Sequence, residues 1–408
     1  MSGQDPHQPN REQMRQRRTE ARRRAVRRRR IVAAAVLLLA LLGVGVAVAG
    51  LLDGGSGSAS PGGSTHRSDP AGSDAKRTSS TTTQPAATTR PHGTGTFTIA
   101  AVGDTMLGRA GYLPSDPGDY FNGVRSALHG DVVFGNLEGT LTNATVGKCG
   151  AQPAADCFEF RVPPEFAHDL RQGGFTLLSQ GNNHSFDYGQ AGLDSTISAL
   201  DHSGIRHTGR THEITYVRSG NLKIAFIGFG PYPNNAPLND FPAARALIHR
   251  AAQHADIVVT SMHAGAEGVA AEHLTGQDEI YLGENRGNPE AFAHMAIDAG
   301  SDLVLGSGPH VLRAMQVYHK RLIAYSLGNF AGYHNFGLDG DLAVSAILQA
   351  KLAADGRFLG GHVVSVRLAG AGQPELDSTD AGAQLIERLS RDDLGSAGAH
   401  ISPSGAIT

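Results

Sequence analysis

Polar residues that can bind a metal ion follow six apolar runs of this sequence, each at the point where the run ends. The six segments are Gly103-Asp104-Thr105-Met106, Gly135-Asn136-Leu137-Glu138-Gly139, Ser179-Gln180-Gly181-Asn182-Asn183-His184, His263-Ala264-Gly265, Gly306-Ser307-Gly308-Pro309-His310 and Ser326-Leu327-Gly328-Asn329-Phe330. One such segment means little. Six of them supply carboxylate, amide and imidazole groups that could together bind a divalent cation and activate water.

Each of these residues, taken alone, has a simpler explanation. Asp104 could cap the following turn, and Glu138 could be a solvated loop acid. Asn182 and Asn183 could be turn formers. A single histidine such as His263 would more often be a hydrogen-bonded structural residue, and the same holds for His310. The prediction of a site therefore depends on the segments being taken together.

The apolar runs themselves predict strands, at residues 97–102, 132–136, 175–179, 223–228, 257–263, 303–306 and 322–327. Helical patterns lie between them, one with Leu193, Ile197 and Leu200 on a shared face and another that begins at Asn288-Pro289. This alternation indicates an α/β fold. In such folds reactive groups collect beyond the carboxyl ends of the strands, where all six segments are expected.

The formal net charge of -3 is the sum of two opposite parts. Residues 1–30 hold 11 Arg and 3 acidic residues, a net of +8, and subtracting this from -3 leaves -11 for the rest. Residues 31–52 are uncharged and apolar, long enough at about 1.5 Å per residue to span a hydrocarbon layer of about 30 Å. The sequence predicts a basic cytoplasmic segment, a single transmembrane anchor and an extracytoplasmic remainder.

Two alternatives bear on this N-terminal region. Ala47-Val48-Ala49 resembles a signal-peptidase site, so cleavage after Ala49 would give a secreted form. The Arg block could instead bind nucleic acid. Membrane topology already accounts for that charge, and no nucleic-acid partner is predicted. The cytoplasmic membrane is the first expected partner.

Composition divides the remainder of the chain. Residues 53–96 contain no Val, Ile, Leu, Met or aromatic residue, and they predict a disordered Gly/Ser/Thr/Pro linker. Residues 97–370 predict one folded domain, and residues 371–408, where Gly, Ser and Ala again increase, predict a loose tail. The only two cysteines, Cys149 and Cys157, lie eight positions apart. In an exported domain a local disulfide is favoured over a metal site that lacks nearby partners.

The order and the amino-acid sequences of these motifs resemble those of the CapA family of bacterial capsule synthesis or poly-γ-glutamate synthesis proteins. The matching segments are AVGDTMLGR (101–109), GNLEG (135–139), GNNHSFDYG (181–189), HAG (263–265), DAGSDLVLGSGPHVL (298–312) and IAYSLGNF (323–330). The family looks like a branch of the calcineurin-like metallophosphatases. The resemblance implies a four-layer α/β/β/α sandwich with a metal site at the strand ends.

Carried over motif by motif, the resemblance assigns roles to individual residues. His184 becomes the candidate general acid. The candidate metal ligands are Asp104, Glu138, Asn183, His263 and His310, and Asn136, Tyr188 and Asn329 either orient those ligands or pack in the core. One divalent ion, Mn, Mg, Zn or Fe, is the expected cofactor.

This chain departs from the superfamily pattern at three positions. Met106 and Gly308 stand where histidines are usual, and Asn136 stands where Asp is usual, so that Glu138 must substitute from a shifted position. These departures weaken a two-metal phosphatase site but leave a one-metal site plausible.

Three functions are compatible with this sequence. The resemblance implies a membrane-anchored component of capsule or poly-γ-glutamate synthesis or export, with an anionic envelope polymer and other polymer-synthesis membrane proteins as partners. The first alternative is a metal-dependent hydrolase of a phosphoester or amide bond in such a polymer, so enzyme status stays open. The second is a plain extracellular binding module.

Overall fold

A computed structural model describes residues 93–151, 154 and 157–408. The predicted basic segment, the predicted anchor at 31–52 and most of the predicted linker lie outside these residues. Within the described part of the chain, no helix combines the length and the apolar character that a membrane crossing needs.

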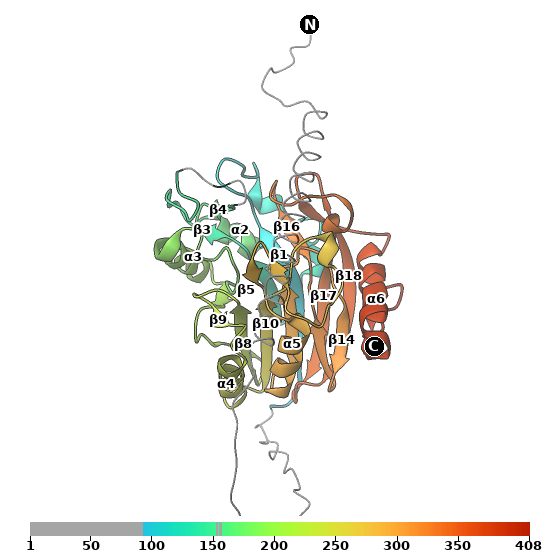
Figure 1. The fold of residues 1–408 in the computed structure, drawn as a ribbon. Helices are drawn as coiled ribbons and strands as arrows, with labels where there is room; N and C mark the ends of the chain where they lie inside the picture. Colours follow the sequence, from blue (N-terminus) through green and yellow to red (C-terminus); the bar gives the residue numbers. More distant parts are fainter. Residues whose placement is uncertain (1–92, 152–153, 155–156) are drawn as a thin grey trace, which may run out of the picture. The chain divides into compact units, whose positions relative to one another are not determined.

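The larger of the two main sheets has nine strands in the described residues and carries β1 at its centre (Figure 1). Its order is β19-β18-β17-β1-β2-β5-β6, with β16 paired to β1 and β20 paired to β18. The neighbours β1, β2, β5 and β6 run parallel, whereas β17, β18, β19 and β20 pair antiparallel. The strands are β1 (Thr96–Met106), β2 (Val132–Leu137), β5 (Leu177–Ser179), β6 (Arg206–Thr208), β16 (Asn329–Gly332), β17 (Val344–Ala353), β18 (Phe358–Ala369), β19 (Gln373–Leu376) and β20 (Ala406–Ile407).

The second sheet has seven strands in the described residues, in the order β14-β15-β13-β10-β8-β7, with β9 paired to β8. Its inner strands are parallel and its two outer strands, β14 and β7, are antiparallel, so this sheet is mixed as well. The strands are β7 (Thr215–Ser219), β8 (Leu222–Gly230), β9 (Ala236–Pro237), β10 (Ile257–His263), β13 (Leu303–Ser307), β14 (Met315–Tyr318) and β15 (Arg321–Ala324).

Two short strand pairs and five helices complete the described fold. The pairs are β3 (Thr140–Leu141) with β4 (Arg161–Val162) and β11 (Ile280–Tyr281) with β12 (Glu284–Asn285), and the helices are α2 (Phe166–Gly173), α3 (Gly189–His202), α4 (Phe241–Ala252), α5 (Pro289–Asp298) and α6 (Ala381–Leu394). The predicted start of α5 is confirmed: Asn288 accepts a hydrogen bond from the Ala291 amide, and Pro289 needs no partner for its nitrogen.

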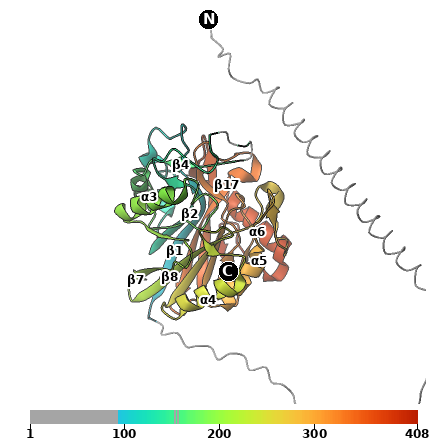
Figure 2. The ribbon, with the colours of Figure 1, turned by 60° about the vertical axis from the view of Figure 1, so that its left-hand side comes forward.

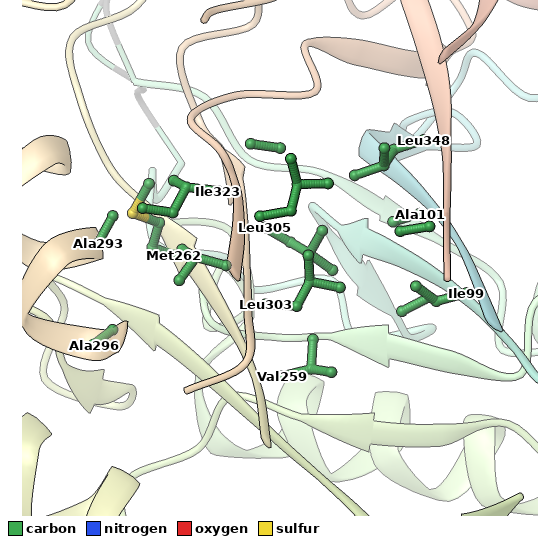
Figure 3. Packing of buried hydrophobic residues seen from close by; sticks show 14 of the residues in the cluster. Ile99, Ala101, Val259, Met262, Ala293, Ala296, Leu303, Leu305, Ile323 and Leu348 are labelled. Carbon is green, nitrogen blue, oxygen red and sulfur yellow. The ribbon is translucent and has the colours of Figure 1, made fainter. Parts of the chain in front are cut away.

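Apolar side chains hold the two sheets face to face. Along β1, Phe97, Ile99 and Ala101 belong to the core cluster between the sheets, while Ala100 and Val102 belong to a second cluster on the opposite face. This alternation follows from the two-residue period of a strand, and it places a layer of side chains on each face of β1. Figure 3 shows Ile99 and Ala101 opposite Leu303 and Leu305 of the other sheet.

Helices cover both outer faces (Figures 1 and 2). Buried residues of α2 and α3 belong to the cluster on the outer face of the nine-stranded sheet, and those of α4 and α5 pack on the seven-stranded sheet. The predicted α/β fold is thus confirmed, with two mixed sheets at its centre.

The prediction of a loose tail at residues 371–408 is wrong. β19 and β20 both pair with β18, and α6 buries Leu385, Ile386 and Leu389 against the core. The spacing of these three residues places them on one face of a helix. The segment also contains many Gly, Ser and Ala residues, so its overall composition does not reveal this amphipathic pattern.

Candidate functional site

Parallel pairing brings the candidate residues to one end of the two sheets. On the nine-stranded sheet Asp104 is the register partner of both Asn136 and Asn329. On the seven-stranded sheet His263 is the register partner of Ser307, which begins the turn that leads to His310. The carboxyl ends of these strands therefore meet where the sequence predicts a site.

Asp104, Glu138 and His263 form the centre of the cluster, and all three are buried. Their ligand atoms lie within 4.8 Å of one another, a spacing that suits a shared metal ion. His310 joins them: its Nδ1 lies 3.0 Å from Oδ2 of Asp104 and its Nε2 lies 3.7 Å from Oε1 of Glu138. His263 Nε2 lies 3.8 Å from the same Glu138 oxygen.

Several buried polar atoms of the candidate ligands lack a hydrogen-bond partner among the described residues. They are both carboxylate oxygens of Glu138, Nε2 of His263 and Oδ1 of Asn183. A buried acceptor without a partner costs about 1–3 kcal/mol, and more when it is charged. A divalent cation would satisfy such atoms, and oxygen with imidazole nitrogen is a donor set that these metals accept. The residues present therefore fit a metal ion.

The protonation states follow from burial and from neighbouring charges. Burial and the charge of Asp104 raise the pKa of Glu138 well above its usual value. Burial would raise the pKa of Asp104 too, but the hydrogen bond and charge of His310 lower it. Burial opposes a charge on His310, yet Glu138 and Asp104 raise its pKa to about 10. Two carboxyl groups so close together do not both ionise easily without a cation.

His263 has the opposite perturbation. Burial lowers the pKa of His263 to about 3, which keeps its ring neutral at physiological pH. Neutral imidazole is the form that binds metals.

Two of the three predicted orienting residues contact candidate ligands. Asn136 donates to Oδ1 of Asp104 over 2.9 Å and accepts from Asn182 over 3.0 Å. Asn329 Oδ1 lies 3.0 Å from Nδ1 of His310, which adopts a positive φ of 61°. Such a backbone conformation is uncommon outside glycine and is held here by these contacts.

Tyr188 lies with a different set of residues. Its hydroxyl donates to Glu159 over 3.3 Å, and the guanidinium of Arg161 lies 5.5 Å from its ring centroid. Glu159 and Arg161 are not candidate ligands, so these contacts do not show Tyr188 orienting one.

The structure also separates the two adjacent asparagines. Asn182 is fully engaged, since its amide nitrogen donates to Asn136 and to the Leu137 carbonyl, and its oxygen accepts from the His184 amide. Asn183 lines the cavity, and its side-chain oxygen is one of the atoms without a partner. Asn183 is accordingly the better candidate ligand.

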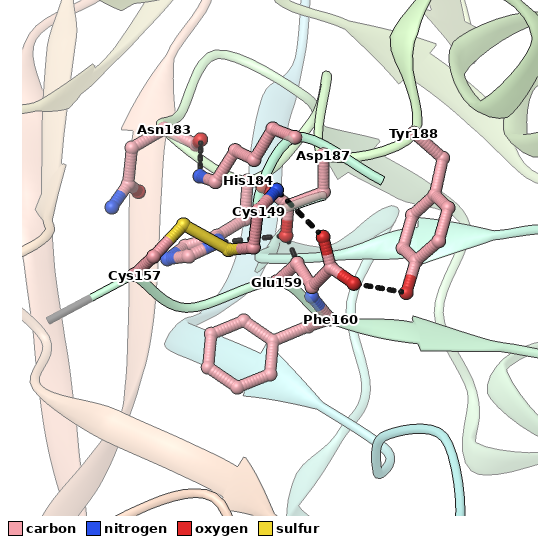
Figure 4. Close-up of a disulfide and its surroundings, with 9 residues drawn as sticks. Cys149, Cys157, Glu159, Phe160, Asn183, His184, Asp187 and Tyr188 are labelled. Atoms are coloured by element: carbon pink, nitrogen blue, oxygen red, sulfur yellow. Dashed lines mark hydrogen bonds and ion pairs between the residues drawn. A yellow bond between two sulfur atoms is a disulfide. The ribbon is translucent and has the colours of Figure 1, made fainter. Parts of the chain in front are cut away.

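His184 lies on the cavity wall and is fixed by Asp187 (Figure 4). Its Nδ1 lies 2.8 Å from Oδ2 of Asp187, while Lys148 Nζ lies 2.6 Å from the other oxygen of that carboxylate. The Phe160 ring packs against the imidazole at 4.5 Å. Burial lowers the pKa of His184, although the charge of Asp187 acts in the opposite direction.

The predicted disulfide between Cys149 and Cys157 is present beside His184 (Figure 4). It closes the loop that follows Lys148, and Glu159 accepts a hydrogen bond from the Cys149 amide. The disulfide therefore holds one wall of the cavity in place.

The two positions where histidines are missing have distinct surroundings. Gly308 has a φ of +107°, and a Cβ there would lie 3.1 Å from Nε2 of His263, so a side chain would be strained and would crowd that ring. Met106 lines the cavity, with its sulfur 3.6 Å from Nδ2 of Asn335.

A cavity of about 730 Å³ opens over the cluster. Of the predicted catalytic, metal-binding and orienting residues, four are part of its lining: Asn183, His184, His310 and Asn329. It is also lined by Lys148, Tyr232, Glu267 and Arg286, which the sequence analysis did not select. Glu267 follows His263 by four positions, and this short spacing could have indicated from the sequence that Glu267 lies near the site. Arg286 and Tyr232 lie in loops without a recognisable pattern.

Comparison with known proteins adds the evolutionary context. The model of the family described as "Bacterial capsule synthesis protein PGA_cap" matches residues 98–333. The capsule biosynthesis protein CapA of Bacillus anthracis is 29% identical over 259 residues, which cover 57% of this chain and 59% of that protein. The PGA biosynthesis protein CapA of Bacillus subtilis is 26% identical over 282 residues, covering 62% of this chain and 67% of that protein.

Among solved structures, a 5'-nucleotidase precursor from Thermus thermophilus aligns with a TM-score of 0.37 at 13% identity. The alignment covers 73% of this chain and 59% of that one.

Proposed function

The chain belongs to the bacterial capsule synthesis protein family, whose model spans more than half of it, and from this membership we propose that it takes part in the synthesis or export of a capsule or poly-γ-glutamate-type envelope polymer. The names of the two Bacillus relatives refer to capsule biosynthesis and to PGA biosynthesis. The matched region, residues 98–333, contains every candidate ligand together with His184.

The protein would act outside the cytoplasm, anchored by residues 31–52. The charge-free apolar run directly after the Arg block supports this topology. A disulfide in the folded domain agrees with an oxidising compartment. Cleavage after Ala49 would release the same domain as a secreted protein.

The proposed cofactor is one divalent metal ion held by Asp104, Glu138, Asn183, His263 and His310. The observation that carries this part is the group of buried acceptor atoms without partners at the centre of the cluster. When bound, such an ion supplies Lewis acidity toward a ligand oxygen. Asn136 and Asn329 hold Asp104 and His310 in the orientation that this set requires.

A second candidate function is hydrolysis of a phosphoester or amide bond in the polymer. His184 favours it, because Asp187 occupies Nδ1 and leaves Nε2 as the nitrogen that can exchange a proton with a ligand in the cavity. To act as a general acid at the leaving group, His184 would need a proton on Nε2 as well, which the charge of Asp187 favours and burial opposes.

Gene deletion with complementation tests the proposal. Deletion should remove a cell-surface anionic polymer, and the wild-type chain should restore it. Unchanged surface polymer in the deletion strain would contradict the proposed function. An Asp104→Ala/His310→Ala double variant should fail to restore the polymer if the metal site is needed. Restoration by that variant, at wild-type export level, would leave the site without a role in this process.

His184→Gln separates the two functions. A hydrolase should lose complementation with this variant, because the proton donor is gone. A non-catalytic component should keep it. The matched control is His249→Gln, an exposed histidine in the last turn of α4, and it should complement in both cases.

A further inference from the structure

Buried polar atoms without a partner fall into two kinds at this end of the described structure. The acceptor atoms belong to the candidate metal cluster. In the loops that follow β8 and β12, two donor groups also lack a hydrogen-bond partner among the described residues: the hydroxyl of Tyr232 and Nη1 of Arg286. Both residues line the cavity. Buried acceptors suit a cation, whereas buried donors suit an anion.

Arg286 is rigidly held and almost completely buried, with a side chain only 5% exposed. Its Nε lies 3.0 Å from Glu284 and its Nη2 lies 3.2 Å from Glu267. The guanidinium carbon lies 5.5 Å from the ring centroids of both Tyr232 and Tyr281. These contacts fix two edges of the guanidinium and leave Nη1 without an acceptor among the described residues.

The backbone also fixes Arg286. Its amide donates to the carbonyl of Glu279, and its own carbonyl accepts from the amide of Gly265, two residues after His263. The β11–β12 pair thus attaches Arg286 to the strand end that carries a candidate metal ligand. A group placed this way cannot swing into solvent to find water.

Arg313, another buried arginine of this protein, is held differently. Its two terminal nitrogens both donate to Glu279, at 2.9 and 2.8 Å, and only its Nε lacks a partner among the described residues. Arg286 makes no such closed pair.

Tyr232 is the neighbouring donor. Burial raises the pKa of Tyr232 far above its usual value, so the hydroxyl keeps its proton and can donate it. Its ring lies 6.3 Å from the ring of His263, and the charge of Arg286 acts on both Glu138 and His263. Tyr232 therefore lies beside His263, and Arg286 lies close enough for its charge to act on the cluster.

We propose that Arg286 and Tyr232 form an oxyanion subsite that binds a carboxylate group of the anionic polymer next to the metal cluster. This inference rests on the proposed function for the identity of the ligand. Nη1 of the guanidinium supplies charged N–H donors that suit a carboxylate oxygen, and the neutral hydroxyl of Tyr232 adds another donor. Glu267 and Glu284 surround the subsite with negative charge, so the cation should strengthen binding of the anion.

Calorimetric titration of the full chain in detergent tests the subsite. The probes are a γ-glutamyl oligomer of about six residues and inorganic phosphate, each with Mn²⁺ and with a chelator. Tyr232→Phe removes one hydroxyl and leaves the ring, so it should fold normally. Loss of a hydrogen bond to a charged group should weaken oligomer binding about ten- to hundredfold. Arg286→Lys, which keeps the charge but loses the planar donor pair, should do the same.

Tyr120→Phe is the matched control, because Tyr120 is also buried and its hydroxyl donates to the Gly372 carbonyl, away from the cavity. It should leave both dissociation constants unchanged. If Tyr232→Phe and Arg286→Lys weaken binding of the oligomer alone, the subsite is specific for a carboxylate; if they weaken binding of phosphate equally, it is a general oxyanion site. Both results support the subsite. Weaker binding of phosphate alone would overturn its assignment to a carboxylate.

Two results would refute the subsite. The first is that Tyr232→Phe and Arg286→Lys bind both probes as tightly as Tyr120→Phe does. The second is that the wild-type chain binds neither probe. If that chain still restores surface polymer in the complementation assay, only the subsite has failed and the proposed function stands.

Discussion

Replacing Glu138 by glutamine should stabilise the metal-free protein and abolish its stabilisation by metal. Glu138 is buried beside Asp104, and its pKa is raised well above its unfolded value of 4.5. A carboxyl of this kind favours the folded state below pH 4.5 and loses that contribution as the pH rises toward its folded value. A glutamine side chain at this position has nearly the same shape but does not ionise.

The size of the effect follows from proton linkage. Within that window, one proton changes the free energy of unfolding by up to about 1.4 kcal/mol per pH unit. The advantage of the variant over the wild type in chelator should therefore grow between pH 5 and pH 7. A cation at a hundredfold excess over its dissociation constant should stabilise the wild type by about 2.7 kcal/mol, and the variant by far less.

Urea unfolding of the full chain in detergent measures both effects, with a chelator and then with Mn²⁺ or Zn²⁺. Glu279→Gln is the control: this carboxylate is also buried but pairs with Arg313, so its loss should destabilise by about 3–5 kcal/mol at every pH. The reasoning fails if Glu138→Gln is less stable than the wild type in chelator throughout this range, or if the cation stabilises both proteins equally.

Three further changes have expected outcomes. Gly308→Ala, at φ +107°, should lower the free energy of unfolding by about 1–2 kcal/mol and weaken metal binding, as measured by urea unfolding and calorimetry. A Cys149→Ser/Cys157→Ser variant opens a loop with a sequence separation of 8, and its free energy of unfolding should fall by about 2.5 kcal/mol. An unchanged midpoint of urea unfolding would show that the disulfide does not stabilise the fold. Asp187→Asn should lower the pKa of His184 further, because the carboxylate charge opposes the effect of burial, and NMR titration of the ring should detect the shift.

The convergence of the site could be predicted from the sequence because strand ends follow simple rules. Asp104, Glu138 and His263 each lie at or just beyond the end of an apolar run, and parallel pairing then requires them to lie at one end of the sheets. The functional roles of these residues stay predictions. Their proximity is what the structure establishes.

The choice between Asn182 and Asn183 was possible from the sequence only through family resemblance. Both residues occupy the same turn, and only the hydrogen bonds of Asn182 to Asn136 and Leu137 show which one is free to face a ligand. Residue type and spacing contain no information on such a difference.

Arg286 and Tyr232 could not be predicted, because tertiary contacts alone bring them to the cavity. Arg286 follows a two-residue strand, and its own backbone is held by hydrogen bonds with Gly265 and Glu279. The C-terminal helix was missed for another reason: three apolar positions on one face of α6 are enough to bury it, but they hardly change the composition of the segment.

The pairing of β19 and β20 with β18 has a consequence for solubility. β18 has 12 residues, and without those partners it would present an open row of backbone donors and acceptors to other chains. β19 covers Val366–Ala369 through four pairs, and β20 covers Gly361 and His362. The sheet consequently ends in strands of four and two residues, which are poor templates for intermolecular β-pairing. A chain truncated at residue 370 should aggregate through this exposed edge, so the last 38 residues protect the protein from self-association as well as completing its core.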